Sequence, residues 1–421
     1  MSNKITTSDR NHLIVGLIFL VFFVISFLTN ILGALNPKVS ESFHLSDTMV
    51  GFLPFAFFIA YGIMSIPSGI MVEKFGGKKM ILIAFLLALL GSIMVGLFPS
   101  YTSFFTSLFI IGTGMAVLQV VINPLLRVSG GEENFAFTSV MAQLIFGLAS
   151  FVSPQMYSYL VKNIDAGNTE KPLVNLLSQM VPESLSWISV YWVFALISLL
   201  MIVLVALTKF PKITLKSDER VGSKVSFMEL LKNKYVILYF LGIFAYVGTE
   251  QGISFWMSKF LSVYHGVDPD TAGADAVSYF WLLMTIGGLF GLICMRLFDS
   301  KLVLRWFTLS ALVFLALGIF GSHDIALWCL PITGFSLSVM YPSIVSLGLN
   351  SVDKHHGSFA GILMSGIAGG AVIQLLIGGI SDVTTLKTGM LFIFITLGYI
   401  LSISFWAKPI VRNKTIQKSK S

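Results

Sequence analysis

Long, unbroken apolar stretches alternate with short polar connections along the whole chain. Twelve stretches predict helices, at residues 13–36, 47–73, 79–98, 101–128, 134–162, 186–208, 235–264, 272–298, 302–321, 324–351, 355–382 and 386–407. A helix needs about 20 apolar residues to cross the hydrocarbon core of a bilayer. The stretches are solidly apolar rather than alternating, which argues against a transmembrane β-barrel. We therefore expect an all-α polytopic membrane protein with twelve transmembrane helices.

The composition agrees with a chain that is surrounded by a lipid bilayer. Of the 421 residues, 56% are hydrophobic and 11% are charged. So few charges could not keep a soluble domain of this length in solution. The first apolar run follows Lys4 and Arg10 and is too long for the core of a signal peptide. We expect it to remain in the protein as the first helix.

Basic residues gather on one side of the predicted spans. If the N-terminus lies inside, 22 of the 27 Lys and Arg residues fall on the inner side, and the opposite side holds Lys38, Lys162, Lys171, Lys259 and Lys387. This asymmetry is the positive-inside pattern. It predicts that both termini lie in the cytoplasm, in a bacterial inner (plasma) membrane. The net charge of +7 then reflects topology, and we expect no nucleic-acid partner.

The chain divides into two similar halves. We expect an N-terminal six-helix bundle at 1–208, a basic cytoplasmic linker at 209–234, and a C-terminal six-helix bundle with a short basic tail at 235–421. Asn123-Pro124 is expected to interrupt the fourth helix as Tyr341-Pro342 interrupts the tenth. Paired six-helix halves around a midplane site are the layout of many secondary transporters.

Glu250 is the one carboxylate that we place inside a predicted span, out of 20 Asp and Glu residues. Burying a carboxylate there is costly unless it is paired, solvated, protonated or accompanied by a cation. No Lys or Arg lies at a similar depth in the sequence. These properties suit a residue that couples transport to H+ or Na+. The alternative is a permanently protonated Glu250 that joins two helices through a hydrogen bond.

Uncharged polar and aromatic residues in the predicted spans are candidates for substrate binding. Amides both donate and accept hydrogen bonds, which suits a ligand covered in hydroxyl groups. Aromatic rings can stack on the apolar face of a sugar. Each amide could instead join two helices. The candidates are the amides Asn30, Gln119, Asn123, Gln143, Gln251 and Gln374, and the aromatic residues Tyr246, Trp256, Trp281 and Tyr341, with Trp256 the first choice for stacking.

Several function classes lack the residues that they need. No Lys or Arg is buried deep enough to hold a phosphate or carboxylate, which argues against anionic substrates. There is no P-loop, and no motif for hydrolysis inside the membrane. We therefore expect no enzyme and no cofactor beyond a coupling ion. Cys294 and Cys329 lie in apolar stretches, where they pack as small hydrophobic residues rather than bind a metal.

The segment from Gly69 to Lys79 resembles the signature of the major facilitator superfamily. Its conformational motif consists of Gly69, Glu73, Lys74, Gly76 and Lys78. Other motifs resemble the fucose permease (fucose–galactose–glucose–proton symporter) branch. They are Tyr61-x5-Pro67-x-Gly69, Asn123-Pro124 followed by Ala142-Gln143, Tyr246-Val-Gly-Thr-Glu250, and the segment from Tyr341 to Gly348.

The resemblance implies two six-helix bundles that work by alternating access around a sugar site. Asn30 and Gln143 match amides of that site. Glu250 stands where the fucose permease has Gln and glucose-type relatives have Glu. Gly33 and Gln119 stand where fucose permeases carry an Asp and a Glu that are linked to proton coupling. The resemblance thus implies a sugar cavity and leaves the coupling route open.

We predict a monomeric secondary transporter that imports a neutral hexose or related monosaccharide, coupled to H+ or Na+ through Glu250. The alternatives are an exporter of amphipathic small molecules and an uncoupled sugar facilitator. A membrane enzyme or a non-transporting receptor is the rival from another class. An enzyme that modifies lipids should gather His, Asp or Cys at one interface, and the sequence has no such cluster.

Overall fold

The computed structural model describes residues 12–168, 170–182, 184–211, 224–352 and 356–410. Within these ranges the regular structure is helical, with no strand. The first half contains α1 (His12–Thr29), α2 (Leu32–Ser42), α3 (Asp47–Phe75), α4 (Gly77–Leu97), α5 (Tyr101–Gly130), α6 (Phe135–Asp165), α7 (Pro172–Ser178) and α8 (Ser189–Leu207).

The second half begins with the short α9 (Lys224–Leu231), which precedes the long α10 (Lys234–His265). It continues with α11 (Ala274–Leu297), α12 (Ser300–Phe320), α13 (His323–Leu337), α14 (Met340–Leu349), α15 (His356–Ser365), α16 (Gly369–Val383), α17 (Leu386–Met390) and α18 (Phe392–Trp406). The described residues contain twelve spans that are long and apolar enough to cross a membrane, which confirms the predicted count.

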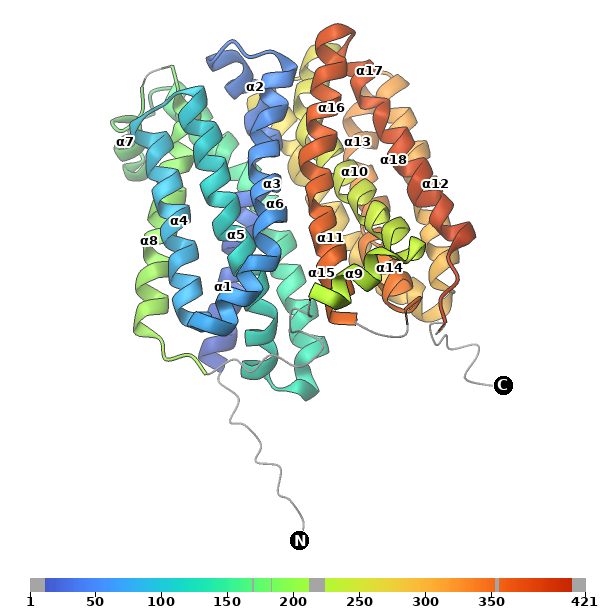
Figure 1. Ribbon diagram of the computed structural model, residues 1–421. Coiled ribbons are helices and arrows are strands. Elements are labelled where there is room, and N and C mark those ends of the chain that lie inside the picture. Colours follow the sequence, from blue (N-terminus) through green and yellow to red (C-terminus); the bar gives the residue numbers. More distant parts are fainter. Residues whose placement is uncertain (1–11, 169, 183, 212–223, 353–355, 411–421) are drawn as a thin grey trace.

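Helices α1 to α8 form one group and α10 to α18 form another, and the start of α1 and the end of α18 lie toward the same end of the molecule (Figure 1). We call that end the inner end and the opposite end the outer end. Part of the predicted linker, 212–223, and the basic tail from 411 lie outside the described residues. The helices α7 and α9 fall in segments that the sequence pattern treated as connections.

Two helix interruptions that we predicted at prolines differ in the structure. The helix α5 continues through Asn123-Pro124, because a membrane helix tolerates Pro where neighbouring groups satisfy the freed backbone carbonyl. The tenth span is broken at 338–339, and Pro342 lies in the first turn of α14. A missing N–H costs little there, because the first turn has no partner for it.

The first span is longer than predicted. It ends at Ser42 rather than at residue 36, and it is broken between α1 and α2. Because α2 contains polar residues, the sequence pattern predicted that the first span ends at residue 36. In the structure Lys38 forms an ion pair with Asp270 (3.1 Å), and the Asn36 side chain donates to the Phe255 carbonyl (2.9 Å).

One lysine in each half holds the end of its last helix in the same way. The Lys78 ammonium, at the second residue of α4, donates to the carbonyls of Ala206 and Thr208 at 2.8 Å each. The Lys301 ammonium, at the second residue of α12, donates to the Ala407 carbonyl at 2.8 Å and the Phe405 carbonyl at 3.4 Å. Cations stabilise helix C-termini. The two halves thus repeat a specific contact.

The outer end joins the two groups through charged and backbone groups. The Lys259 ammonium lies 2.6 Å from an Asp47 oxygen and donates to Ser40 at 2.8 Å. The Asp382 carboxylate accepts the backbone N–H groups of Asp47 (2.7 Å) and Thr48 (2.9 Å), which begin α3. A carboxylate at a helix N-terminus satisfies N–H groups that have no partner within the helix.

Further contacts at the outer end join α6 to the start of α11. The Tyr157 hydroxyl donates to Asp270 at 2.5 Å, and the Gln155 amide donates to Asp275 at 2.6 Å. These polar contacts across the two groups lie between mid-depth and the outer end. The structure is therefore closed at its outer end.

Candidate substrate and ion site

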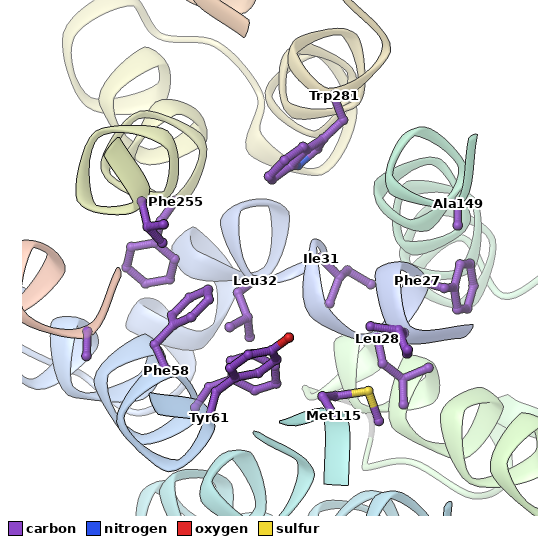
Figure 2. Close-up of a cluster of buried hydrophobic side chains, with 14 of the residues drawn as sticks. Phe27, Leu28, Ile31, Leu32, Phe58, Tyr61, Met115, Ala149, Phe255 and Trp281 are labelled. Atoms are coloured by element: carbon purple, nitrogen blue, oxygen red, sulfur yellow. The ribbon is translucent and has the colours of Figure 1, made fainter. Parts of the chain in front are cut away.

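A narrow pocket lies between the two groups, at mid-depth beneath the closed outer end. Its lining comes from both halves and consists of Thr29, Asn30, Leu32, Gly33, Pro54, Phe58, Gln251, Ser254, Phe255 and Trp281. The volume is about 10 Å³, which leaves room for about one water molecule. Figure 2 shows Phe58, Phe255 and Trp281 directed toward the chain between Leu28 and Leu32. A larger ligand requires the pocket to widen.

The break between α1 and α2 presents Asn30 to this pocket. Its amide donates to Ser150 of α6 at 2.8 Å and to Ser26 at 3.3 Å. Asn30 is buried, and it lines the pocket at the same time. The residue therefore joins two helices and also lies where a ligand would contact it.

Glu250 is held by residues of its own helix. Its carboxylate accepts a hydrogen bond from the Tyr246 hydroxyl and another, at 3.0 Å, from the Gln251 amide. The Tyr341 ring lies 5.8 Å from the Tyr246 ring between centroids, and the Tyr341 hydroxyl lies 3.1 Å from the sulfur of Met364. No Lys, Arg or His in the described ranges forms an ion pair with Glu250. The structure thus gathers four of the candidate residues, Tyr246, Glu250, Gln251 and Tyr341.

The two tryptophan candidates lie in different surroundings. Trp281 lines the pocket, and its indole N–H has no hydrogen-bond partner among the described residues. Trp256, the first choice for stacking, is fully buried and does not line the pocket. Its neighbour Phe255 lines the pocket instead, because Gln251, Ser254 and Phe255 follow the spacing of one helix face.

Phe58 and Phe255 line the pocket and are not among the candidates predicted from the sequence. Phenylalanine is abundant in this chain, with 37 residues, so a single Phe carries little information. Phe255 follows the candidate Gln251 by four residues, so both lie on one face of the same helix, and this spacing would have selected Phe255. No comparable signal marks Phe58.

The other amide candidates do not line the pocket. Gln119 is half-buried, whereas Asn123 and Gln143 are exposed toward the inner half of the molecule. Gln143 lies two turns before Ser150, the partner of Asn30, on the same face of α6. Gln374 is fully buried, and within the described part of the chain neither of its side-chain polar atoms has a hydrogen-bond partner.

Gly33 lies where fucose permeases carry an acid, and the structure gives a steric reason for glycine here. A Cβ atom at Gly33 would overlap the Ser254 carbonyl oxygen of α10. Backbone atoms cannot move aside as a flexible side chain can. A larger residue at this position would separate α2 from α10 and open the outer end.

The conformational motif lies at the inner end, where α3 meets α4. Gly76 has φ of +83°, which favours glycine, and it joins the two helices. Glu73 and Lys74 are exposed and Gly69 is buried. Lys78 holds the C-terminus of α8, as described above.

Comparison with known proteins agrees with this architecture. A sequence profile described as the Major Facilitator Superfamily matches residues 18–375. The chain is 28% identical over 405 residues to a protein of Brucella abortus named glucose/galactose transporter, and the match covers 94% of each chain. It is 26% identical over 398 residues to a protein of Escherichia coli named L-fucose-proton symporter, covering 90% of each.

The fold is also similar to a solved structure, that of the E. coli fucose:proton symporter. The TM-score is 0.65 at 24% sequence identity, and the match covers 94% of this chain and 98% of that chain. The resemblance to the fucose permease branch is thereby confirmed, as is the prediction of a transporter rather than an enzyme. Because the family profile covers most of its length, the chain belongs to the Major Facilitator Superfamily.

Proposed function

We propose that this protein imports a neutral monosaccharide by alternating access. The observation that carries the proposal is the pocket between the two bundles, where Asn30, Gln251 and Trp281 offer polar groups beside aromatic rings and next to Glu250. Hydroxyl-rich ligands need both donors and acceptors. The relatives named for glucose, galactose and fucose support a hexose as the substrate class.

Glu250 is the residue that we propose for ion coupling. It borders the pocket through Gln251 and has no basic partner among the described residues. A carboxylate so placed can gain a proton or be accompanied by a cation when the site opens to either side. The name of the E. coli relative favours H+, and Na+ remains the alternative ion.

An uncoupled sugar facilitator is the second candidate. Gly33 and Gln119 replace the acids that the resemblance links to proton coupling. If Glu250 were a neutral support for Tyr246 and Gln251, transport would run down the sugar gradient alone. Export of amphipathic molecules finds no support in the names of the relatives.

The membrane arrangement follows from the same proposal. We place the protein in a bacterial inner membrane as a monomer, with both termini and the linker at 209–234 in the cytoplasm. The bundles at 1–208 and 235–421 would then move about the pocket. The outer end that is closed here would face the periplasm, and the sugar would leave through the inner end.

Purified protein in proteoliposomes tests the proposal. We expect glucose, galactose or fucose to be taken up against its gradient when an inward proton gradient is imposed, with alkalinisation of the outside medium. A sodium gradient at constant pH distinguishes the two ions. Sugar uptake that responds to neither gradient would favour the facilitator, and absence of sugar binding would reject the proposal.

A further inference from the structure

A second cavity lies far from the pocket, at the inner end of the C-terminal group. Its volume is about 620 Å³, and it is lined by Asp299, Lys301, Leu302, Arg305, Ser404, Ala407, Lys408 and Pro409. These residues lie at the start of α12, including its N-cap, and at or just beyond the end of α18. Both helices lie at the side of the molecule that faces away from the N-terminal group (Figure 1). The transport function proposed above does not use this cavity.

The contact of Lys301 with the end of α18 explains a lysine at this position, but it does not explain a second cation at Arg305. The contact of Lys301 with the end of α18 repeats the contact of Lys78 with the end of α8. Arg305 lies one turn after Lys301, whereas the residue one turn after Lys78 is Leu82. The second cation therefore belongs to the C-terminal half alone.

The Arg305 side chain is held in a fixed position. Its Nε donates to the Ser404 hydroxyl and its terminal nitrogen to the Ser404 carbonyl, both at 3.3 Å. Its guanidinium carbon lies 4.2 Å from the centre of the Phe405 ring. A guanidinium has five N–H donors, so donors remain after these contacts. Such a group binds phosphate oxygens with defined geometry.

The lining carries an excess of positive charge. Lys301, Arg305 and Lys408 oppose the single carboxylate of Asp299. That carboxylate accepts the backbone N–H of Lys301 at 2.9 Å and so caps α12. The cavity is thus electrostatically suited to an anion.

Exposed apolar residues follow three of the lining residues directly in the chain, and we call them the apolar rim. They are Trp306 after Arg305, Phe405 after Ser404 and Ile410 after Pro409, with exposed fractions of 47%, 61% and 61%. The adjoining spans begin at Ser300 and end at Trp406, so the cavity lies at the boundary of the membrane. Aromatic residues at such a boundary sit at the level of the lipid headgroups.

We propose that this cavity binds the phosphate headgroup of an anionic phospholipid. The cations would contact the phosphate, and the lipid chains would lie against the exposed apolar residues. A soluble phosphate compound would share the charged contacts and would gain nothing from Trp306 and Phe405. The apolar rim is the reason to assign a lipid.

Two variants remove charge from the cavity, and a third removes it elsewhere. Lys408→Gln changes an exposed residue beyond the end of α18, and Arg305→Gln keeps a donor for Ser404. Lys79→Gln is the matched control, because Lys79 is an exposed lysine at the same end of the molecule but on α4 of the other group. Bound phosphatidylglycerol is counted by native mass spectrometry during titration of the detergent-solubilised protein.

We expect each cavity variant to weaken the tightest phosphatidylglycerol site about five-fold, and the control to leave it unchanged. Asp299→Asn keeps the helix cap, because Asn caps as well as Asp, and should strengthen binding several-fold. This gain cannot come from misfolding. Phosphatidylcholine should bind weakly to all variants.

Three results would overturn the proposal. Equal weakening in the Lys79→Gln control would mean that surface charge alone attracts the lipid. Unchanged binding in the two cavity variants would place the lipid elsewhere. Full competition by glycerol 3-phosphate at concentrations similar to those of the lipid would assign the cavity to a soluble phosphate compound.

Discussion

Residues around Glu250 divide into those that hold its carboxylate and those that line the pocket. Tyr246 donates to the carboxylate, and Gln251 both donates to it and lines the pocket. A ligand that engages the Gln251 amide would compete with Glu250 for the same N–H donors. In the proposed function, ligand binding and the charge of Glu250 would therefore be linked through one side chain.

Glu250→Gln should abolish sugar accumulation driven by an ion gradient and leave sugar counterflow largely intact. Glutamine keeps the shape and one acceptor oxygen for Tyr246, but it cannot change its charge. Concentrative uptake and counterflow are measured side by side in proteoliposomes. Tyr246→Phe, which removes the donor and keeps the acid, should reduce accumulation without abolishing it. Full accumulation by Glu250→Gln would mean that the residue is only a protonated support.

Asn30→Ala and Gln143→Ala should weaken sugar binding without loss of folded protein. Asn30 is buried and Gln143 is exposed here, so Gln143 would contact the sugar only once the site has closed around it. A ligand hydroxyl that loses its partner in the closed site costs about 1–3 kcal/mol, or roughly five- to hundred-fold in affinity. Binding is measured by isothermal titration, and folding by thermal unfolding. Gln374→Leu is the contrast, because its amide has no partner among the described residues. That variant should unfold at a higher temperature, and unchanged affinity in both alanine variants would assign the amides to helix packing.

At the scale of the elements, the sequence predicted the number of spans and missed how they are broken. Hydrophobic length alone is enough to locate twelve spans. It could not find the first span beyond residue 36, because Lys38 is tolerated through Asp270, far away in the sequence. Nor could it find the pocket, whose lining depends on which faces of α1, α2, α3, α10 and α11 meet.

Lys78→Ala and Lys301→Ala should each lower the free energy of unfolding by about 1 kcal/mol, since each lysine satisfies two carbonyls at a helix end. The matched control is Lys79→Ala, because Lys79 is exposed and adjacent. Thermal or denaturant unfolding of the purified protein measures the difference. Equal effects of Lys78→Ala and Lys79→Ala would contradict the role that we assign to the contact.

At the scale of the whole molecule, a few polar contacts close the outer end. Solvent-exposed ion pairs contribute about 0–1 kcal/mol each, and Lys38 is 27% exposed, whereas Lys259 and Asp47 form a more buried pair, at 15% and 17%. A transporter must pass between two states of similar free energy, which strong contacts would prevent. The close contact between Gly33 and the Ser254 carbonyl also keeps the outer end closed, through steric fit rather than through charge.

Asp382→Asn should shift the protein toward the state that is open at the outer end. The charge at the N-terminus of α3 is worth about 0.3–1 kcal/mol, which corresponds to roughly a two- to five-fold change in population. Spin labels at Leu173 and Trp328, both exposed, would report the distance across the outer end. Asp324→Asn, at an exposed acid on α13, is the control. Equal distance distributions in wild type and Asp382→Asn would show that this cap does not hold the end closed.

A disulfide across the outer end tests whether that end must open during transport. A Cβ atom at Gly379 would lie 4.0 Å from the Thr48 hydroxyl oxygen, which suits a disulfide between Thr48→Cys and Gly379→Cys. Cys294 and Cys329 are first replaced by Ser. Oxidation should stop sugar uptake, and reduction should restore it, because in the proposed import route the sugar reaches the pocket through the outer end. Each single cysteine variant should transport under both conditions. Complete crosslinking with undiminished uptake would mean that the sugar enters by another route, and that the closed end is not a gate.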